Sequence, residues 1–484
     1  MAREKISSLD TFLSRMDVEI NNKERFCKRK STSNPVVHID YSAFLDDEHK
    51  IKENLFSLAE KTIRDLDLRV YFVMLSWWGR GDQAEWTGSN LFENLMEFQK
   101  RGMCRLFLSY QAGEAPPSSL YRWCRKKKIP VLDVDNSRLL SREGKVVVPE
   151  KAPGKAENMV KALKMIQQIE NKEKNPPEKV LVLFLDDDYT QFHWMNYFMM
   201  FAPWVFSFLK KTGDEQVDAV LNKVKKIGFI KSGSPRIILP YEIQDRIVRG
   251  SWKPLDYLGI SLALVELALS HQRFSSEEEK EGIEELISLL NKIRKSNQIF
   301  SPKNRLDFLG RSHNQRLERI WREYIYRGGR VTQRLEAIFR YLSGRRHCRW
   351  LREFTFLLHG DQGAPLNTWL EFSPFSGYAL EIGLLMQTVC DKAFEEYQIL
   401  NILGLPHSHQ RSKELDIWNM LDTILFALDL SRVLYKDLSV KSLINVYGYQ
   451  QYYPMLDRFG NVTIHTPHPQ RLKIYPPLKL LDLA

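Results

Sequence analysis

One stretch decides the fold: KVLVLFLDDD, residues 179–188. Its six consecutive apolar residues, 180–185, predict a strand buried on both faces, because a half-exposed strand would alternate apolar and polar residues. Three carboxylates follow at once. In an open α/β sheet, ligands bind outside the carboxyl ends of the strands, so Asp186, Asp187 and Asp188 are expected to face a crevice. A solvated acidic turn or a helix cap is the alternative interpretation.

The chain before this stretch repeats a pattern of strand, loop and helix. Strand candidates and helix candidates alternate at 70–75, 91–100, 104–109, 119–127, 130–134 and 155–170. Such alternation predicts right-handed βαβ crossovers and a mainly parallel sheet. Residues 68–190 therefore predict an α/β fold whose sheet is flanked by helices.

The composition excludes several classes of protein. A chain of 484 residues with 43% hydrophobic residues can bury a sizeable core, so a chiefly disordered protein is excluded. No run of about 18 uncharged apolar residues occurs, and the first residues, MAREKISSLDTFLSRMD, lack an apolar core. We therefore expect no membrane span and no secretory signal, and a cytoplasmic location. The 5 cysteines have no CxxC spacing, which predicts reduced thiols.

The basic excess of the chain is concentrated in one region. The formal net charge is +11, and arginines are frequent between residues 305 and 352. Charge alone permits nucleic acid, a membrane surface or a phosphorylated ligand as the partner. Because the arginines flank a motif suited to a small phosphate, GGRVT at 328–332, we rank nucleic-acid binding last.

Two further motifs carry chemistry. In GGRVT, the glycines let the backbone approach a ligand, and Arg330 and Thr332 can donate hydrogen bonds to a phosphate. An ordinary turn capped by the threonine is the alternative. In the segment His407-Ser408-His409, an imidazole can complete a metal site, whereas exposed loop histidines are the alternative.

Taken together and in order, five motifs resemble those of glucosyl-3-phosphoglycerate synthases. They are GKAEN (154–158), LDDD (185–188), GGRVT (328–332), GYALEIGLL (377–385) and HSHQ (407–410). The chain is similar, less closely, to mannosyl-3-phosphoglycerate synthases. Both are retaining glycosyltransferases of the GT-A nucleotide-diphospho-sugar fold. The resemblance covers roughly residues 68–430 and implies hexose transfer from a nucleotide sugar, UDP-glucose favoured over GDP-mannose, to 3-phosphoglycerate or a similar small phosphorylated or carboxylate acceptor.

The resemblance implies a donor and metal site. Asp186 and Asp188 match a DxD-type motif that binds the nucleotide diphosphate through Mg²⁺ or Mn²⁺, and Asp187 lies between them on the donor side. Lys155 matches a lysine that contacts the donor. His407, in preference to His409, matches a metal-binding histidine that shares the ion with Asp188.

The resemblance also implies an acceptor site. Gly329, Arg330 and Thr332 match a loop that binds the phosphoglycerate. Tyr378 and Glu381 match a pair that contacts the acceptor and the transferred sugar, and together with Asp188 they are the catalytic candidates. No clear nucleophile is present, so attack from the face of the leaving group is the favoured route to retention.

Three departures from the family pattern leave alternatives open. MLSWWGRGD (74–82) replaces the usual donor loop, GDQGA (360–364) replaces a Gly-Glu-Tyr/His-Ala segment, and the distance from Asp188 to Gly328 predicts a helical insertion. A catalytically silent GT-A-like binding or scaffold protein is therefore a second hypothesis. A homodimer is left open.

The chain is predicted to contain five parts. They are an N-terminal arm with helices (1–67), a nucleotide-sugar-binding half (68–234), a helical insertion (235–320), an acceptor-binding and catalytic half (321–440) and a C-terminal tail (441–484).

Overall fold

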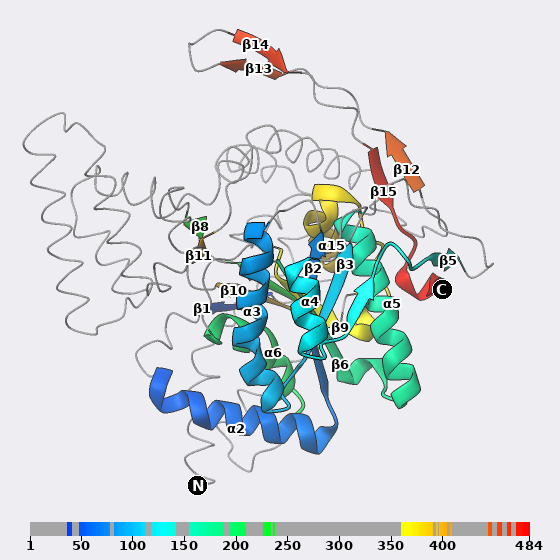
Figure 1. Ribbon diagram of the computed structural model, residues 1–484. Coiled ribbons are helices and arrows are strands. Elements are labelled where there is room, and N and C mark those ends of the chain that lie inside the picture. Colours follow the sequence, from blue (N-terminus) through cyan, green and yellow to red (C-terminus); the bar gives the residue numbers. More distant parts are fainter. Residues whose placement is uncertain are drawn as a thin grey trace, which may run out of the picture.

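An eight-stranded sheet forms the centre of the computed structural model (Figure 1). Its strands, in spatial order, are β1 (Val36–Asp40), β10 (Gln398–Leu403), β7 (Ile227–Gly233), β9 (Gln362–Pro365), β6 (Val180–Leu185), β2 (Arg69–Trp77), β3 (Arg105–Gln111) and β4 (Val131–Asp133). Neighbouring strands run parallel, except that β9 lies antiparallel between β6 and β7. The predicted fold class, α/β with a mainly parallel sheet flanked by helices, is confirmed.

The structure describes residues 36–40, 48–77, 82–111, 118–141, 154–186, 194–209, 226–233, 236–237, 360–390, 394, 396–403, 407–408, 444–447, 453–456, 462–465 and 471–484. The arginine-rich region and the GGRVT motif lie outside them. So does the predicted insertion, apart from the short strand β8 (Arg236–Ile237).

The helices expected between the first strands are present. They are α3 (Asp82–Lys100), α4 (Ser119–Lys126) and α5 (Lys155–Glu173), and each connects two parallel strands of the sheet. The start of α4 is set by Ser118, whose side chain accepts a hydrogen bond from the backbone N–H of Tyr121. The β/α periodicity of the sequence thus predicted this part of the fold correctly.

The order of the strands reverses direction beside β2. The chain runs outward from β2 to β3 and β4, and α5 then carries it back past β2 to β6 on the other side. In open α/β sheets such a reversal leaves a crevice at the carboxyl ends of the two strands, where ligands bind. Asp186 follows β6 directly and therefore lies at this point.

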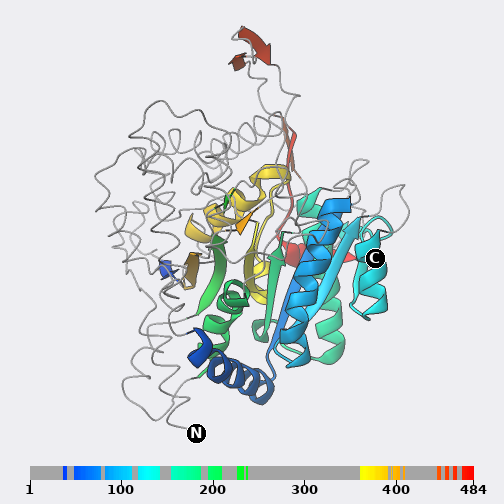
Figure 2. The ribbon, with the colours of Figure 1, turned by 60° about the vertical axis from the view of Figure 1, so that its left-hand side comes forward.

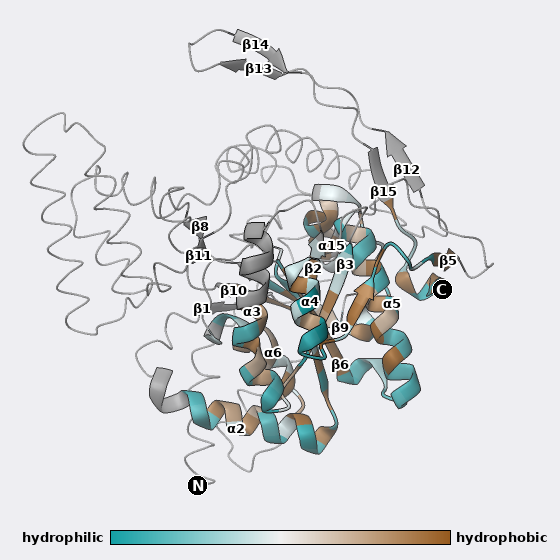
Figure 3. Cartoon of the chain, viewed as in Figure 1, coloured by the Kyte–Doolittle hydropathy of each residue, from teal (hydrophilic) through white to brown (hydrophobic). Residues whose placement is uncertain are grey.

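Helices cover both faces of the sheet, as Figures 1 and 2 show. One face packs against α2 (Glu48–Leu66), α3, α4 and α6 (Trp194–Phe206), and the other against α5, α14 (Leu366–Trp369) and α15 (Leu380–Cys390). Alternate residues of β2 serve the two faces, Phe72 one and Val73 the other. In Figure 3, α2 and α5 carry both apolar and polar residues, as expected for helices with one buried face.

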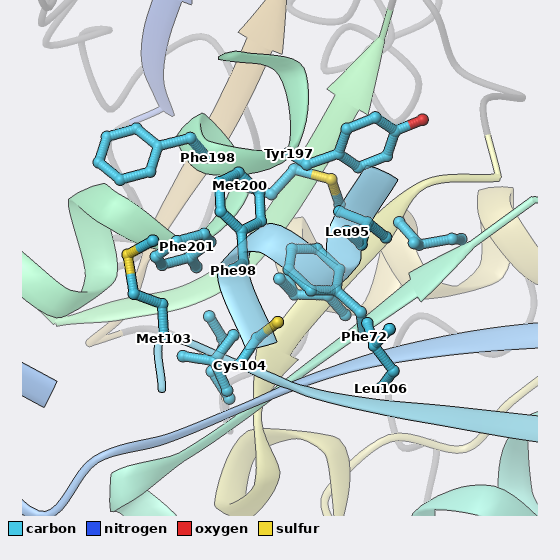
Figure 4. Close-up of a cluster of buried hydrophobic side chains, with 14 of the residues drawn as sticks. Phe72, Leu95, Phe98, Met103, Cys104, Leu106, Tyr197, Phe198, Met200 and Phe201 are labelled. Carbon is cyan, nitrogen blue, oxygen red and sulfur yellow. The ribbon is translucent and has the colours of Figure 1, made fainter. Parts of the chain in front are cut away.

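An aromatic cluster fills the first face (Figure 4). It joins β2, α3, β3 and α6, and includes Phe72, Phe98, Tyr197, Phe198 and Phe201. The rings of Phe98 and Phe201 meet edge to face with centroids 5.7 Å apart, a favourable geometry for aromatic pairs. Because α6 buries nearly all of its side chains here, its sequence WMNYFMMFAPWVF has no polar face.

The end of the described chain packs beside α5 (Figure 1). The strand β16 (Leu481–Leu483) pairs antiparallel with β5 (Leu139–Ser141), and the ammonium group of Lys164 on α5 donates to the backbone carbonyl of Leu478. The backbone N–H of Leu478 in turn donates to the carbonyl of Phe372. This contact connects the C-terminal segment to the loop that leads to α15.

The cysteines and the helices can be compared with the expectations from composition. Cys104 and Cys124 are buried, and burial raises the pKa of the Cys124 thiol to about 12. No helix in the part of the chain that the structure describes is long and apolar enough to cross a membrane.

Candidate active site

Three of the predicted site residues meet at the carboxyl edge of the sheet. Lys155 is the first residue of α5, Asp186 follows β6, and Glu381 lies in the first turn of α15. The Nζ atom of Lys155 lies 2.8 Å from Oδ1 of Asp186 and 2.9 Å from Oε1 of Glu381. The structure therefore joins residues from three separate motifs by two ion pairs.

Local sequence explains how each side chain reaches this point. Gly154 caps α5 without a side-chain hydrogen bond, so Lys155 begins the helix next to its exposed N–H groups. Ala156 and Met159 are buried against the sheet and fix the start of the helix there. Glu381 is a buried carboxylate between the apolar residues Leu380 and Ile382, which anchor α15. Both partners of Lys155 are thus held by rigid elements.

The charges of the site stabilise one another. Burial alone lowers the pKa of Lys155, but the carboxylates of Asp186 and Glu381 outweigh burial, and the pKa lies above its ordinary value. The lysine is therefore an ammonium ion under physiological conditions. It presents a fixed positive charge between two negative ones.

Two residues directly before β9, Gly360 and Asp361, contact Asp186, and the sequence did not predict this contact. Oδ1 of Asp361 accepts a hydrogen bond from the backbone N–H of Asp186 at 3.0 Å. A Cβ atom at Gly360 would lie less than 3.0 Å from every atom of the Asp186 carboxyl group. The segment GDQGA was noted as a departure from the family pattern, but nothing in it showed that it would pair with β6.

A second missed residue is Lys231, which is fully buried on β7. Burial lowers its pKa to about 8, although the nearby carboxylates of Glu381, Asp186 and Asp361 oppose the shift. Lys155 adds to it by repulsion. The signal that could have found it is a lysine inside the apolar strand IGFIKSG, since lysine is almost never fully buried without a special reason.

The other predicted site residues are placed only in part or not at all. The backbone of Tyr378 lies in the short helix η7 (Gly377–Ala379), directly before α15. The backbone of His407 lies in β11 (His407–Ser408), which pairs parallel with β8 and follows the carboxyl end of β10. Asp187, Asp188, Gly329, Arg330 and Thr332 lie outside the described residues.

The residue types at this edge suit a hard divalent cation. Oxygen ligands are those that Mg²⁺ and Mn²⁺ prefer, and the Asp186 carboxylate lies at the carboxyl end of β6. The backbone of His407 is on the same edge, beyond β10. Within the described residues no group of three His, Cys, Asp or Glu side chains is placed to hold a metal ion. Asp188 and the His407 side chain would have to complete such a site.

Known proteins of similar structure share little sequence with this chain. No protein-family model matches the chain, and no curated protein matches it. The chain is similar in structure to mannosyl- and glucosyl-3-phosphoglycerate synthases, at low sequence identity.

The mannosyl-3-phosphoglycerate synthase from Rubrobacter xylanophilus shares 14% identity with a TM-score of 0.47, over 91% of this chain and 94% of that chain. The glucosyl-3-phosphoglycerate synthase from Mycobacterium tuberculosis, in complex with Mn²⁺, UDP and phosphoglyceric acid, shares 14% identity with a TM-score of 0.45. The match covers 88% of this chain and 94% of that chain. The same enzyme with Mg²⁺ and UDP matches at 15% identity and a TM-score of 0.42, over 88% of this chain and 95% of that chain. Because a fold does not determine a function, what this chain does has to be inferred from its own residues.

Proposed function

We propose that the chain is a metal-dependent, retaining glycosyltransferase with a GT-A domain. It moves a hexose from a nucleotide sugar to a small phosphorylated or carboxylate acceptor. The observation that carries this proposal is the bridge from Lys155 to Asp186 and Glu381 at the point where the strand order reverses. An ammonium group between two carboxylates at this point suits a ligand that has a diphosphate at one end and hydroxyl groups at the other.

The donor side of the site is formed by α5 and the end of β6. A diphosphate at this place would meet the ammonium group of Lys155 and the positive end of the helix dipole of α5, both of which favour negative charge. Asp186 and Asp188 would hold Mg²⁺ or Mn²⁺ together with His407. When bound, the ion neutralises the charge that develops on the departing nucleoside diphosphate.

The acceptor side is formed by α15 and the segment before it. The Glu381 carboxylate bonds Lys155 through Oε1, and its second oxygen would accept hydrogen bonds from sugar hydroxyl groups. Tyr378 is placed directly before it in the chain. The loop with Gly329, Arg330 and Thr332 would bind the phosphate or carboxylate of the acceptor, which suits the fork of an arginine.

The ion pair between Glu381 and Lys155 bears on the route by which configuration would be retained. A carboxylate that is already paired with an ammonium group has little charge to offer as a nucleophile, so a covalent glycosyl intermediate on Glu381 is disfavoured. The bond from the anomeric carbon to the diphosphate oxygen breaks while the acceptor oxygen bonds to the same face of that carbon. The acceptor proton passes to the departing diphosphate oxygen.

The donor is proposed to be UDP-glucose, with GDP-mannose as the second choice. The end of β2, where MLSWWGRGD replaces the usual donor loop, is the feature that favours the competing hypothesis of a silent GT-A-like binding protein. This edge of the sheet would have to leave room for the base of the nucleotide. Turnover of a nucleotide sugar distinguishes the two hypotheses.

The test is a matrix of UDP- and GDP-sugars against 3-phosphoglycerate and glycerate. Release of nucleoside diphosphate is followed with and without Mg²⁺ or Mn²⁺, and the product is analysed for its anomeric configuration. We expect turnover of at least one pair, dependent on the metal and with retention. Nucleotide-sugar binding without turnover of any pair would support the silent protein.

Two variants test the metal site within the same assay. Asp188→Ala and His407→Ala are expected to abolish turnover while the unfolding temperature stays near that of the wild type. His409→Ala is the matched control, because it removes the neighbouring imidazole that is not assigned to the metal. Full activity in Asp188→Ala or His407→Ala would contradict the proposed metal site.

A further inference from the structure

Gly360 and Asp361 lie directly before β9 and contact Asp186 in two different ways. Both are buried, and neither belongs to a motif that the proposed function uses. Asp361 accepts a hydrogen bond from the backbone N–H of Asp186. Gly360 has no side chain and so leaves room for the Asp186 carboxyl group. The two contacts together define where the Asp186 carboxylate can lie.

The contact at Gly360 is steric. An added Cβ atom would come closer to Oδ1, Oδ2 and Cγ of Asp186 than the 3.0 Å below which real Cβ atoms are essentially never found. The φ angle of Gly360 lies outside the left-handed region, so the backbone itself would accept any residue. An alanine at this position would therefore require the Asp186 carboxyl group to move.

The contact at Asp361 is a charge-assisted hydrogen bond. Its Oδ1 accepts the backbone N–H of Asp186 at 3.0 Å, and its backbone carbonyl accepts the N–H of Ser232 on β7 at 3.1 Å. Asp361 thus connects the end of β6 to β7. The adjacent residue of β7, Lys231, contributes a buried amine whose electrostatic neighbours include Asp361 and Asp186.

We propose that Gly360 and Asp361 are positioning residues that hold the Asp186 carboxylate against Lys155. Asp361 fixes the backbone at the point where the chain leaves β6, and Gly360 leaves the space into which the carboxylate turns. That the positioned carboxylate helps to bind a nucleoside diphosphate rests on the proposed function. The positioning itself does not depend on that assignment.

The steric part is tested by a thermodynamic cycle that needs no ligand. Gly360→Ala is made in the wild type and in an Asp186→Ala background, in which the clashing atoms are gone, and urea unfolding is measured. We expect the variant to raise the unfolding equilibrium constant roughly tenfold more in the wild type than in the Asp186→Ala background, within the range of coupling for contacting residues.

The matched control is Gly363→Ala in β9, three residues further along the chain. Its Cβ atom would clash with the side chain of Leu183 in β6, outside the site. Its cost should be equal in both backgrounds. An equal cost of Gly360→Ala in both backgrounds would overturn the steric role.

The functional part is tested by calorimetric binding of UDP and GDP in the presence of Mn²⁺. We expect Gly360→Ala to weaken binding by about tenfold or more, and Gly363→Ala to leave it unchanged. Asp361→Ala should weaken binding similarly, whereas Asp361→Asn, whose side-chain oxygen can still accept the Asp186 N–H, should largely restore it. This rescue separates a positioning role from a general loss of stability.

The outcomes decide the two proposals separately. Wild-type protein that binds no nucleoside diphosphate would overturn the proposed function, and the unfolding cycle would still decide the positioning of Asp186. Wild-type affinity in both Gly360→Ala and Asp361→Ala would overturn the positioning role while leaving the proposed function intact. If Gly360→Ala does not fold, the Asp361 pair decides.

Discussion

The Nζ atom of Lys155 lies 2.9 Å from Oε1 of Glu381, although 226 residues separate them in the chain. The same Nζ atom bonds Asp186, so one ammonium group connects the end of β6 to the start of α15. Neither carboxylate is exposed beyond 13% of its side chain, and the lysine is exposed by 24%. Removal of this charge would leave two partly buried carboxylates facing each other.

Lys155→Met should therefore lower transfer from a nucleotide sugar by about 100-fold or more, a typical loss when a preorganised charge in an active site is removed. The measurement is kcat/KM for nucleoside diphosphate release. Lys161→Met is the matched control, because Lys161 is a buried lysine of the same helix that pairs with Glu157 and the carbonyl of Val134. The control should lose stability and keep its activity. Equal activity of Lys155→Met and the wild type would exclude Lys155 from the site.

Glu381→Gln should lower kcat more than it changes KM for the donor. The amide keeps the size of the side chain but loses the charge that faces Lys155, and Glu381 is assigned to the acceptor and the transferred sugar rather than to the diphosphate. Steady-state kinetics with the donor varied at saturating acceptor provide the measurement. Glu371→Gln, which alters an exposed pair with Lys479, is the control. An unchanged kcat in Glu381→Gln would contradict the assignment.

The stability of the protein should depend on pH through Lys231. Its pKa is lowered from 10.5 to about 8, so between these values the unfolded chain binds more protons at this residue than the folded chain. The free energy of unfolding contributed by Lys231 should accordingly rise as the pH rises through this window. This gain in the free energy of unfolding should be lost as the pH falls to about 8.

The comparison of wild type with Lys231→Met by urea unfolding isolates this effect, since other groups that titrate in the window are present in both proteins. The gap between the two curves should change by an amount of order 3 kcal/mol across the whole window. Parallel curves would show that the lysine does not titrate in the folded state as described.

Leu478→Ala should destabilise the protein by about 2–5 kcal/mol, the usual cost of such a truncation in a core. Leu478 is fully buried, and its backbone contacts the loop before α15 through Phe372. Thermal and urea unfolding measure the loss. Leu483→Ala, which truncates a half-buried leucine of β16, should cost clearly less. Similar losses in both variants would mean that the C-terminal segment is not anchored at Leu478.

The fold up to β6 could be predicted from local patterns. Each strand there is a short apolar run and each helix has a capping residue or an amphipathic repeat, so the βαβ order followed directly. The strand β9, with the sequence QGAP, carries no such pattern. It is a strand only because it pairs between β6 and β7, which local sequence does not encode.

The sequence pointed to some residues of the candidate site and not to others. Lys155, Asp186 and Glu381 stand in motifs that a family resemblance selects, and the structure joins them. Gly360, Asp361 and Lys231 were missed, because a glycine, an aspartate before a short strand and a single lysine in an apolar run have meaning only through their neighbours. The predictions for Asp188, Tyr378, His407 and the GGRVT loop stay predictions.

The sequence by itself determined the alternation of strands and helices and placed carboxylates at the end of β6, because hydrophobic periodicity and chain order act locally. Only the tertiary structure decided which distant residues share the site. The strand order places β9 between β6 and β7, which makes Lys231 an electrostatic neighbour of Asp186 and brings Asp361 within hydrogen-bonding distance of the Asp186 backbone. In the unfolded chain Asp186 and Asp361 are separated by 175 positions and by the high dielectric of water, so their charges would scarcely interact.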